Sequence, residues 1–154
     1  MFRGRYEHSV DAKGRIALPV RFREELDRLY EDERLIITAH LTDPCLVIYP
    51  LKEWEAFEER LSKLPQLDPK VTMLRRMYVG RAHECALDKQ GRLLVSPELR
   101  RDAGIDRDAV WSGSARYLEL WSKPTYEAHL DQVQKKLVGG ELGEAIEKLA
   151  ELGI

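Results

Sequence analysis

The sequence repeats itself, and this repeat limits the folds open to the chain more than any other feature. The segment YEHSVDAKGR (6–15) aligns with HECALDKQGR (83–92) at a constant offset of 77 residues. Further on, LVIYPLKEWEA (46–56) matches LELWSKPTYEA (118–128) at an offset of 72. Because the order of the two matches is preserved, we interpret the chain as two copies of one unit of about 70 to 80 residues. The second copy is five residues shorter between the matches, where a loop would tolerate the loss.

Each copy opens with a predicted strand, turn and strand. In the first copy a short strand, Tyr6 to Val10, leads into Asp-Ala-Lys-Gly and then into the apolar stretch Ile16 to Leu18. Asp at the first position of such a turn bonds backbone N–H groups two residues on, and Gly at the fourth takes the left-handed conformation that closes a type I turn. The residues with this structural role are Asp11, Gly14, Asp88 and Gly91.

The periodicity of apolar residues and the positions of Gly and Pro predict the remaining elements. A short helix follows each turn segment: VRFREELDRL (20–29), with Phe22, Leu26 and Leu29 on one face, and ELRRDAGI (98–105), ended by Gly104. Two strands come next in each copy, at 34–41, 45–50, 109–115 and 116–121. A helix then closes each copy, at 51–64 and 125–137, and a helix from Pro69 through Met77 joins the copies.

The end of the chain allows two interpretations. Gly139-Gly140 precedes a last amphipathic piece with Leu142, Ile146 and Leu149. It is either a mobile tail or a helix that docks onto the body or onto a neighbouring subunit. We therefore expect an α+β chain with the following parts: unit 1 at 5–50, a helical connection at 51–78, unit 2 at 79–124 and a C-terminal helical segment at 125–154.

Charge is unevenly distributed along the 154 residues, although the net charge is only −2. Residues 1–23 hold six basic and two acidic side chains, and residues 70–101 hold eight basic and three acidic ones. The remainder has 11 basic and 22 acidic residues. This is either ordinary surface variation or a pair of basic patches on an acidic body, which would attract polyanions to one face. Both basic segments contain the repeated turn.

The sequence offers little for catalysis, redox chemistry or metal binding. It contains no GxSxG, GxxxxGK[ST] or HExxH motif, and its four histidines are scattered, so we expect neither an enzyme nor a cofactor. His83-x-Cys85 could supply two soft ligands, but a zinc site needs three or four. Cys45 and Cys85 fit a reducing compartment. Without an apolar run of about 20 residues or a signal peptide, we expect a cytoplasmic protein without a membrane partner.

The Arg that follows each turn needs its own explanation, because turn chemistry requires Asp and Gly but no guanidinium. One interpretation is a structural ion pair, Arg15 with Asp11 and Arg92 with Asp88. The other is DNA binding, since Arg can hold a carboxylate with part of its fork and offer the rest to phosphate or to guanine O6 and N7. Further cations lie near the turns in sequence, so the predicted DNA-binding residues are Arg15, Lys13, Arg92, Lys89, Arg3, Arg5 and Arg81.

These motifs resemble the MraZ family of bacterial transcriptional regulators. The resemblance rests on MFRGRYEHSVDAKGRIALPVRFR, on GRAHECALDKQGR and on the paired DxxxR motifs, and it covers residues 1 to about 138. The DxxxR residues of the family carry over as Asp11, Arg15, Asp88 and Arg92, and its basic turn residue as Lys13. The second copy has Lys89 and Gln90 where the first has Ala12 and Lys13, so the two turns are not strictly equivalent.

The resemblance implies a fold and a function. It implies two tandem SpoVT/AbrB-type units with a double-split β-α-β arrangement, whose swapped hairpins interdigitate about a pseudo-twofold axis, with amphipathic helices attached. The implied partners are double-stranded DNA and further copies of the chain, which form a ring-shaped homo-oligomer, an octamer or larger. Such proteins bind short direct repeats in the promoter of the division and cell-wall gene cluster and repress or modulate its transcription. This implies a nucleoid-associated protein.

Two other functions stay open at the level of sequence. An antitoxin-like DNA-binding protein uses the same fold type, but such chains commonly have one unit and a disordered neutralising tail, unlike the duplicated sequence here. A ring-forming scaffold without DNA specificity would use the basic loops only for ion pairs between subunits. A steep dependence of DNA binding on salt would exclude the purely structural role.

Overall fold

A computed structural model describes residues 1–151 of the chain. By its internal contacts the chain divides into two compact units, Met1–Lys123 and Pro124–Ile154. Each unit is described by itself. The segment expected at 125–154 includes residues 152–154, which lie outside the described residues.

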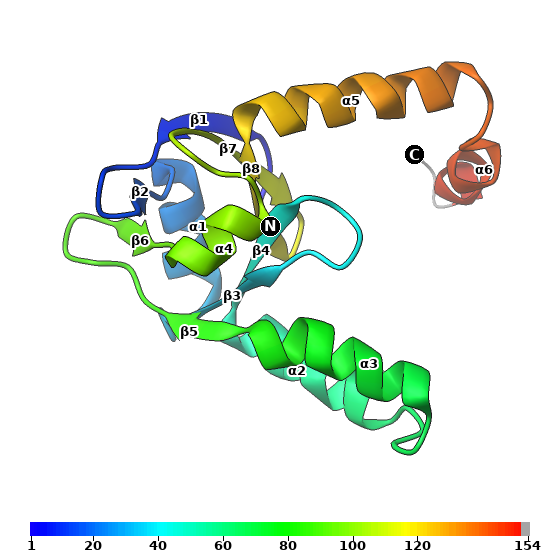
Figure 1. The fold of residues 1–154 in the computed structure, drawn as a ribbon, viewed down its shortest axis with the longest axis horizontal. Helices are drawn as coiled ribbons and strands as arrows, with labels where there is room; N and C mark the ends of the chain where they lie inside the picture. The colour runs from blue at the N-terminus through cyan, green and yellow to red at the C-terminus, as the bar shows by residue number, and fades with distance from the viewer. Residues whose placement is uncertain (152–154) are drawn as a thin grey trace. The chain divides into compact units, whose positions relative to one another are not determined.

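The first unit contains one antiparallel sheet of six strands and a separate ribbon of two (Figure 1). The sheet has the order β1-β7-β8-β4-β3-β5, and the ribbon pairs β2 with β6. The strands span β1 (Arg5–Ser9), β2 (Arg15–Ala17), β3 (Leu35–Ala39), β4 (Cys45–Pro50), β5 (His83–Cys85), β6 (Arg92–Leu94), β7 (Asp108–Ser114) and β8 (Tyr117–Ser122).

The two sequence copies interleave about a pseudo-twofold axis. Strands β1 to β4 belong to the first copy and β5 to β8 to the second, so exchanging the copies reverses the strand order and reproduces the same sheet. At the centre, equivalent positions face each other: Ile16 pairs with Leu93 in the ribbon, and Val47 pairs with Glu119 in the sheet. The predicted α+β fold with interdigitated copies is confirmed. The predicted boundaries between 5–50, 51–78 and 79–124 therefore divide the sequence into its copies, but they do not divide the first unit into separate folded bodies.

The helical segments between the strands are α1 (Val20–Leu29), α2 (Leu51–Ser62), α3 (Pro69–Tyr78), the short 3-10 helix η1 (Val79–Arg81) and α4 (Pro97–Asp102), and α5 (Lys123–Val138) and α6 (Gly143–Glu151) follow the last strand. Asp68 caps α3 by accepting a hydrogen bond from the backbone N–H of Lys70, and Ser96 caps α4 in the same way. Two details of the predicted apolar faces are wrong. Leu29, predicted on the apolar face of its helix, is 38% exposed, and the helix predicted at 51–64 ends at Ser62, so that Leu64 lies beyond it and is 43% exposed.

The five residues missing from the second copy are lost at two places. Glu7 pairs with Val110 and its equivalent, Glu84, pairs with Ile36, so the offset at β3 and β7 is 74. Three residues are therefore lost by then: α4 is four residues shorter than α1, and β7 begins one position earlier than β3 at this offset. Two more are lost at the hairpin that follows, where positions 40–44 of the first copy correspond to 114–116 of the second, because β7 extends one position further than β3. The expected loop accounts for two of the five, and a turn of helix accounts for the rest.

Both copies contribute to one apolar core. Its fully buried side chains include Ile16, Leu93 and Trp111. The indole N–H of Trp111, in the second copy, donates a 3.1 Å hydrogen bond to the carbonyl of Ala17 in the first. A buried indole that finds its partner in the other copy ties β7 to the ribbon, so we expect the two copies to fold together.

The second unit differs in its packing. Helices α5 and α6 bury none of their described residues, although both carry exposed apolar side chains. Across residues 1–151, no helix combines the length and apolar character needed to cross a membrane.

Candidate nucleic-acid interface

Turn 1 (Asp11–Gly14) has the predicted Asx geometry; its equivalent in the second copy is turn 2 (Asp88–Gly91). One carboxylate oxygen of Asp11 accepts hydrogen bonds from the backbone N–H groups of Lys13 and Arg15, both at 2.9 Å. The N–H of Gly14 donates to the Asp11 carbonyl at 3.0 Å, and Gly14 has φ +82°. Because the backbone N–H of Arg15, more than any other group, stabilises the charged carboxylate, the pKa of Asp11 lies below its ordinary value.

The second turn reproduces this arrangement. Asp88 accepts from the backbone N–H groups of Gln90 and Arg92, both at 2.9 Å. Gly91 closes the turn on the Asp88 carbonyl at 2.9 Å with φ +71°. The pKa of Asp88 is lowered in the same way, chiefly by the backbone N–H of Arg92. Both turns thus have the Asx bonds and the left-handed Gly that the sequence predicts for an Asp-Gly turn.

Each turn also fixes the arginine that follows it. The Nε of Arg15 lies 2.7 Å from Asp11 Oδ2, and the Nε of Arg92 lies 2.9 Å from Asp88 Oδ2. About a third of each of these side chains is exposed, so such contacts add little stability. Their consequence is orientation: Nε of each arginine is held by the carboxylate of its own turn, and Nη1 of Arg92 also lies 4.0 Å from Asp11 Oδ2 in the other turn. The predicted ion pairs are present, and they are compatible with an anion-binding role.

The ribbon brings the two turns together (Figure 1). Turn 1 precedes β2 and turn 2 precedes β6, and these strands are antiparallel. The turns therefore lie at opposite ends of a three-residue ribbon, roughly 10 Å apart at the strand rise of 3.3 Å per residue. The carbonyl of Gly91 accepts from the N–H of Leu18, and that of Gly14 accepts from Val95, both at 2.9 Å. Each turn is thus held by the other copy.

A second pair of arginines, Arg23 on α1 and Arg100 on α4, lies against the turns. A Cβ added to Gly14 would be 3.2 Å from Nε and Cζ of Arg100, and one added to Gly91 would be 2.9 Å from Cδ and Cζ of Arg23. The Nε atoms of both side chains are buried, and neither has a hydrogen-bond partner within the part of the chain that the structure describes. Neither residue is among the predicted DNA-binding residues, although the offset of 77 relates the two.

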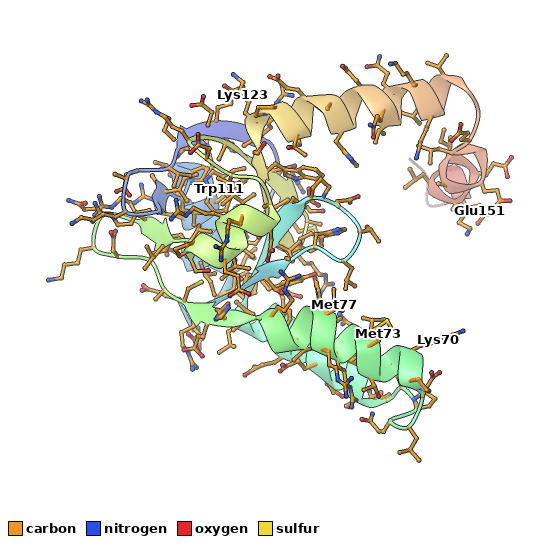
Figure 2. The ribbon with its side chains drawn as sticks, viewed as in Figure 1. Lys70, Met73, Met77, Trp111, Lys123 and Glu151 are labelled. Carbon is orange, nitrogen blue, oxygen red and sulfur yellow. The ribbon has the colours of Figure 1, made fainter. Side chains whose placement is uncertain are left out.

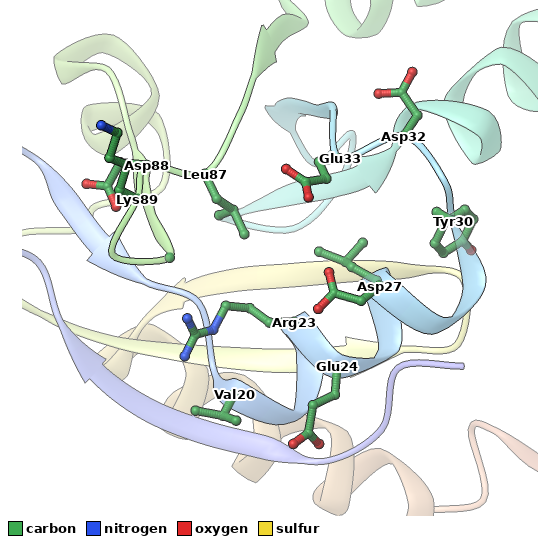
Figure 3. Close-up of a pocket in the computed structure, with 12 residues that line it drawn as sticks. Val20, Arg23, Glu24, Asp27, Tyr30, Asp32, Glu33, Leu87, Asp88 and Lys89 are labelled. Atoms are coloured by element: carbon green, nitrogen blue, oxygen red, sulfur yellow. The ribbon is translucent and has the colours of Figure 1, made fainter.

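The surroundings of the two turns differ in charge. Beside turn 2, a groove of about 340 Å³ runs between Asp88–Gly91 and α1 (Figure 3). Besides Arg23 and Lys89, its charged lining is acidic: Glu24, Asp27, Asp32, Glu33 and Asp88. Beside turn 1, two adjoining hollows share Arg100 and Asp106 and include Arg101, Arg107 and Asp11. Cations therefore outnumber acids beside turn 1, and acids outnumber cations beside turn 2.

The structure gathers four of the seven predicted DNA-binding residues. Lys13 and Lys89 are exposed in the turns next to Arg15 and Arg92. Arg3 precedes β1 and Arg5 begins it, so both lie at the end of the strand away from turn 1. Arg81 lies in η1 and forms an ion pair with Asp102 at the end of α4. These three residues do not join the cluster at the turns.

The other candidate groups have ordinary partners. Glu7 accepts a hydrogen bond from Nζ of Lys123 at 3.0 Å, and Glu84 lies 3.8 Å from Arg34. Cys45 is buried and Cys85 is partly buried, and both are free thiols. Desolvation raises the pKa of both, that of Cys85 to about 12. Within residues 1–151, no three His, Cys, Asp or Glu side chains are grouped so that they could hold a metal ion.

Comparisons with known proteins agree with this geometry. A family described as "MraZ protein, putative antitoxin-like" matches the chain twice, at residues 1–77 and 78–138. A protein of Shewanella sp. (strain MR-7) named "Transcriptional regulator MraZ" is 40% identical over 154 residues, which is the full length of both chains. The protein of the same name from Shewanella oneidensis (strain MR-1) is 39% identical over the same length. That of Marinomonas sp. (strain MWYL1) is 41% identical over 128 residues, 83% of this chain and 84% of its own.

Proposed function

The chain belongs to the MraZ family, and from that premise we propose that it is a sequence-specific DNA-binding repressor of transcription. Its targets would be short direct repeats in the promoter of the division and cell-wall gene cluster, bound by a ring-shaped homo-oligomer. The observation that carries the proposal is the pair of Asp-braced arginines at the ends of one ribbon. A role on DNA would place the protein on the nucleoid.

Turn 1 supports this proposal most strongly. The ion pair to Asp11 uses Nε of Arg15, so its terminal amino groups can meet guanine O6 and N7 in the major groove. Lys13, in the same turn, is placed to contact phosphate. Arg100 packs against Gly14 of the same turn and adds a further positive charge beside it. Phosphate contacts would supply most of the affinity, and the base contact would select the sequence.

A ring would multiply a weak contact. One chain offers only two turns, and a single bidentate base contact contributes about 1–3 kcal/mol. Identical turns spaced around a ring would meet evenly spaced repeats, so each contact after the first would form at a high effective concentration. Affinity should therefore rise steeply with the number of repeats.

The test compares the full-length protein with its Arg15→Ala variant on a promoter duplex at fixed salt. We expect binding at least tenfold weaker, because the variant loses both the base contact and a nearby positive charge. Arg60→Ala is the matched control, since Arg60 is an exposed arginine on α2; its affinity should stay within about twofold of the wild type. Unchanged binding by Arg15→Ala would remove this residue from the interface.

A second measurement tests the ring mechanism. Duplexes carrying one, two, three and four repeats should bind with progressively higher affinity, and the logarithm of affinity should fall with the logarithm of salt concentration by about 0.9 per phosphate contacted. Equal affinity for all four duplexes would contradict the avidity argument while leaving DNA binding itself intact.

A further inference from the structure

Helix α3 exposes an apolar stripe that the core leaves uncovered. Met73 is 66% exposed and Met77 is 51% exposed, and Leu74 lies between them. With Leu41 from the loop after β3, these side chains line a groove of about 260 Å³. Figure 2 shows Lys70, Met73 and Met77 along α3. Isolated exposed apolar residues are common, but a contiguous set in a groove indicates a binding surface.

The opposite face of α3 is already occupied. Val71 and Tyr78 are buried, and the hydroxyl of Thr38 donates a 3.0 Å hydrogen bond to the Tyr78 carbonyl. Helix α3 is therefore anchored by one face, and Met73 and Met77 stay exposed on a fixed helix. Its charged residues are Lys70, Arg75 and Arg76, with no acidic residue in the helix. Arg75 and Arg76 line a different hollow, and the charged residues that line the groove are Lys70 and Arg81, so its charged lining is basic.

Helix α6 has the complementary character. Leu142, Ile146 and Leu149 recur at helical spacing, and Ile146 and Leu149 are 47% and 46% exposed. The helix has three glutamates and one lysine, and none of its described residues is buried. An acidic amphipathic helix of this kind fits an apolar groove with a basic rim, because the apolar stripe is buried while opposite charges remain at the edges.

We propose that the α3 groove of one subunit binds helix α6 of a second copy of the chain. Donor and acceptor surfaces differ, so each subunit can give one helix and receive another. Such a heterologous contact passes from subunit to subunit and forms a closed ring when the rotation permits. This inference rests on the proposed function, because it supplies the contact that would build the ring.

The test uses two full-length double variants. Met73→Glu/Met77→Glu blocks the groove, and Ile146→Glu/Leu149→Glu blocks the helix; all four positions are exposed, so the fold should be kept. We expect each variant to lose the wild-type assembly and show a smaller mass by light scattering. The control is Leu67→Glu, a 97% exposed apolar residue in the loop before α3, which should keep the wild-type mass.

Mixing identifies which chain donates the helix. Met73→Glu/Met77→Glu keeps the native helix α6, and Ile146→Glu/Leu149→Glu keeps the native α3 groove. A mixture of the two should therefore form a one-to-one species. A wild-type mass in either double variant, a monomeric wild type, or the absence of a mixed species would overturn the proposal. The last result would indicate docking within one chain.

DNA binding is measured in parallel. Both variants retain the turns, so each should bind a single-repeat duplex as tightly as wild-type protein does. Loss of the assembly with unchanged single-repeat binding supports the docking contact. If wild-type protein binds no DNA, the proposed function fails, while the mixing result still decides the docking contact.

Discussion

The two Asp-Gly turns have the same backbone and different surroundings. Both have an Asx bond, a left-handed Gly and an Arg held through Nε. Turn 1 faces α4, which is short and contributes Arg100 and Arg101, whereas turn 2 faces α1, whose extra turn brings Asp27 close. Duplication therefore reproduces the local structure of the turn, whereas the charged residues around each turn depend on the helix that the other copy supplies.

The largest expected difference between the turns concerns stability. In Gly14→Ala the new Cβ would lie 2.8 Å from the Val95 carbonyl oxygen, and backbone cannot move aside easily; in Gly91→Ala it would meet the flexible Arg23 side chain. Left-handed strain costs both variants about 1–2 kcal/mol, and the clash should bring the cost at Gly14 to about 3 kcal/mol. The measurement is the free energy of unfolding in urea.

Gly104→Ala is the control for strain alone, because Gly104 has φ +61° and nothing lies within 4 Å of its added Cβ. Its cost should match that of Gly91→Ala once Arg23 has moved. Equal destabilisation by Gly14→Ala and Gly91→Ala would show that the Val95 carbonyl yields as easily as an arginine side chain, and the two turns would then be mechanically equivalent.

The next difference concerns DNA affinity. Arg92→Ala should weaken binding at least fivefold less than Arg15→Ala does, because the acidic groove beside Arg92 repels phosphate. The two variants remove the same side chain from equivalent turns, so each serves as the control for the other in a binding titration at one salt concentration. Identical losses would mean that the surrounding charges do not decide which turn engages DNA.

Much of this comparison follows from the sequence, and its limits have physical reasons. The period-77 match identifies Asp11 and Asp88 as turn residues, because Asx turns depend on local spacing alone. Charge counted along the chain makes the two turn segments look alike. The acids that face turn 2, such as Asp27 and Glu33, come from the other copy, so only the interleaved fold places them there.

The arginines on the helices show the same limit. Arg23 and Arg100 follow the offset of 77, yet the repeat alone does not say that their Nε atoms are buried against a glycine of the other copy. Burial depends on tertiary packing, which a sequence period cannot report. The five-residue difference between the copies is visible in the sequence as a changed offset, but only the strand registers show that three of the five are lost before β7 and two at the hairpin after it.

Neutralising acids beside turn 2 should reduce the asymmetry between the turns. Asp27→Asn/Glu33→Gln leaves every turn residue in place and removes two negative charges from the groove. We expect DNA affinity to rise about two- to threefold, a modest gain because solvent and salt screen exposed charges. The measurement is a titration with the single-repeat duplex.

Glu55→Gln/Glu58→Gln on α2 is the matched control for net charge. It should change affinity less than the groove variant does, since α2 does not line the groove beside turn 2. Equal gains from both double variants would assign the effect to overall charge and would weaken the argument from local surroundings.

The smallest expected difference is in the pH dependence of the two turns. The pKa values of Asp11 and Asp88 both lie below the ordinary 3.8, because backbone N–H groups bond the charged carboxylates. A lowered pKa stabilises the folded state above pH 3.8, and this stabilisation is lost as the pH falls through the folded value. Asp11→Asn and Asp88→Asn should therefore each lose a constant amount of stability between pH 5 and pH 8, and the loss should shrink below about pH 3.8. Between pH 5 and pH 8 the loss should be slightly larger for Asp11→Asn, because Asp11 also lies 4.0 Å from Nη1 of Arg92; coinciding curves would show that this contact between the turns adds no stability.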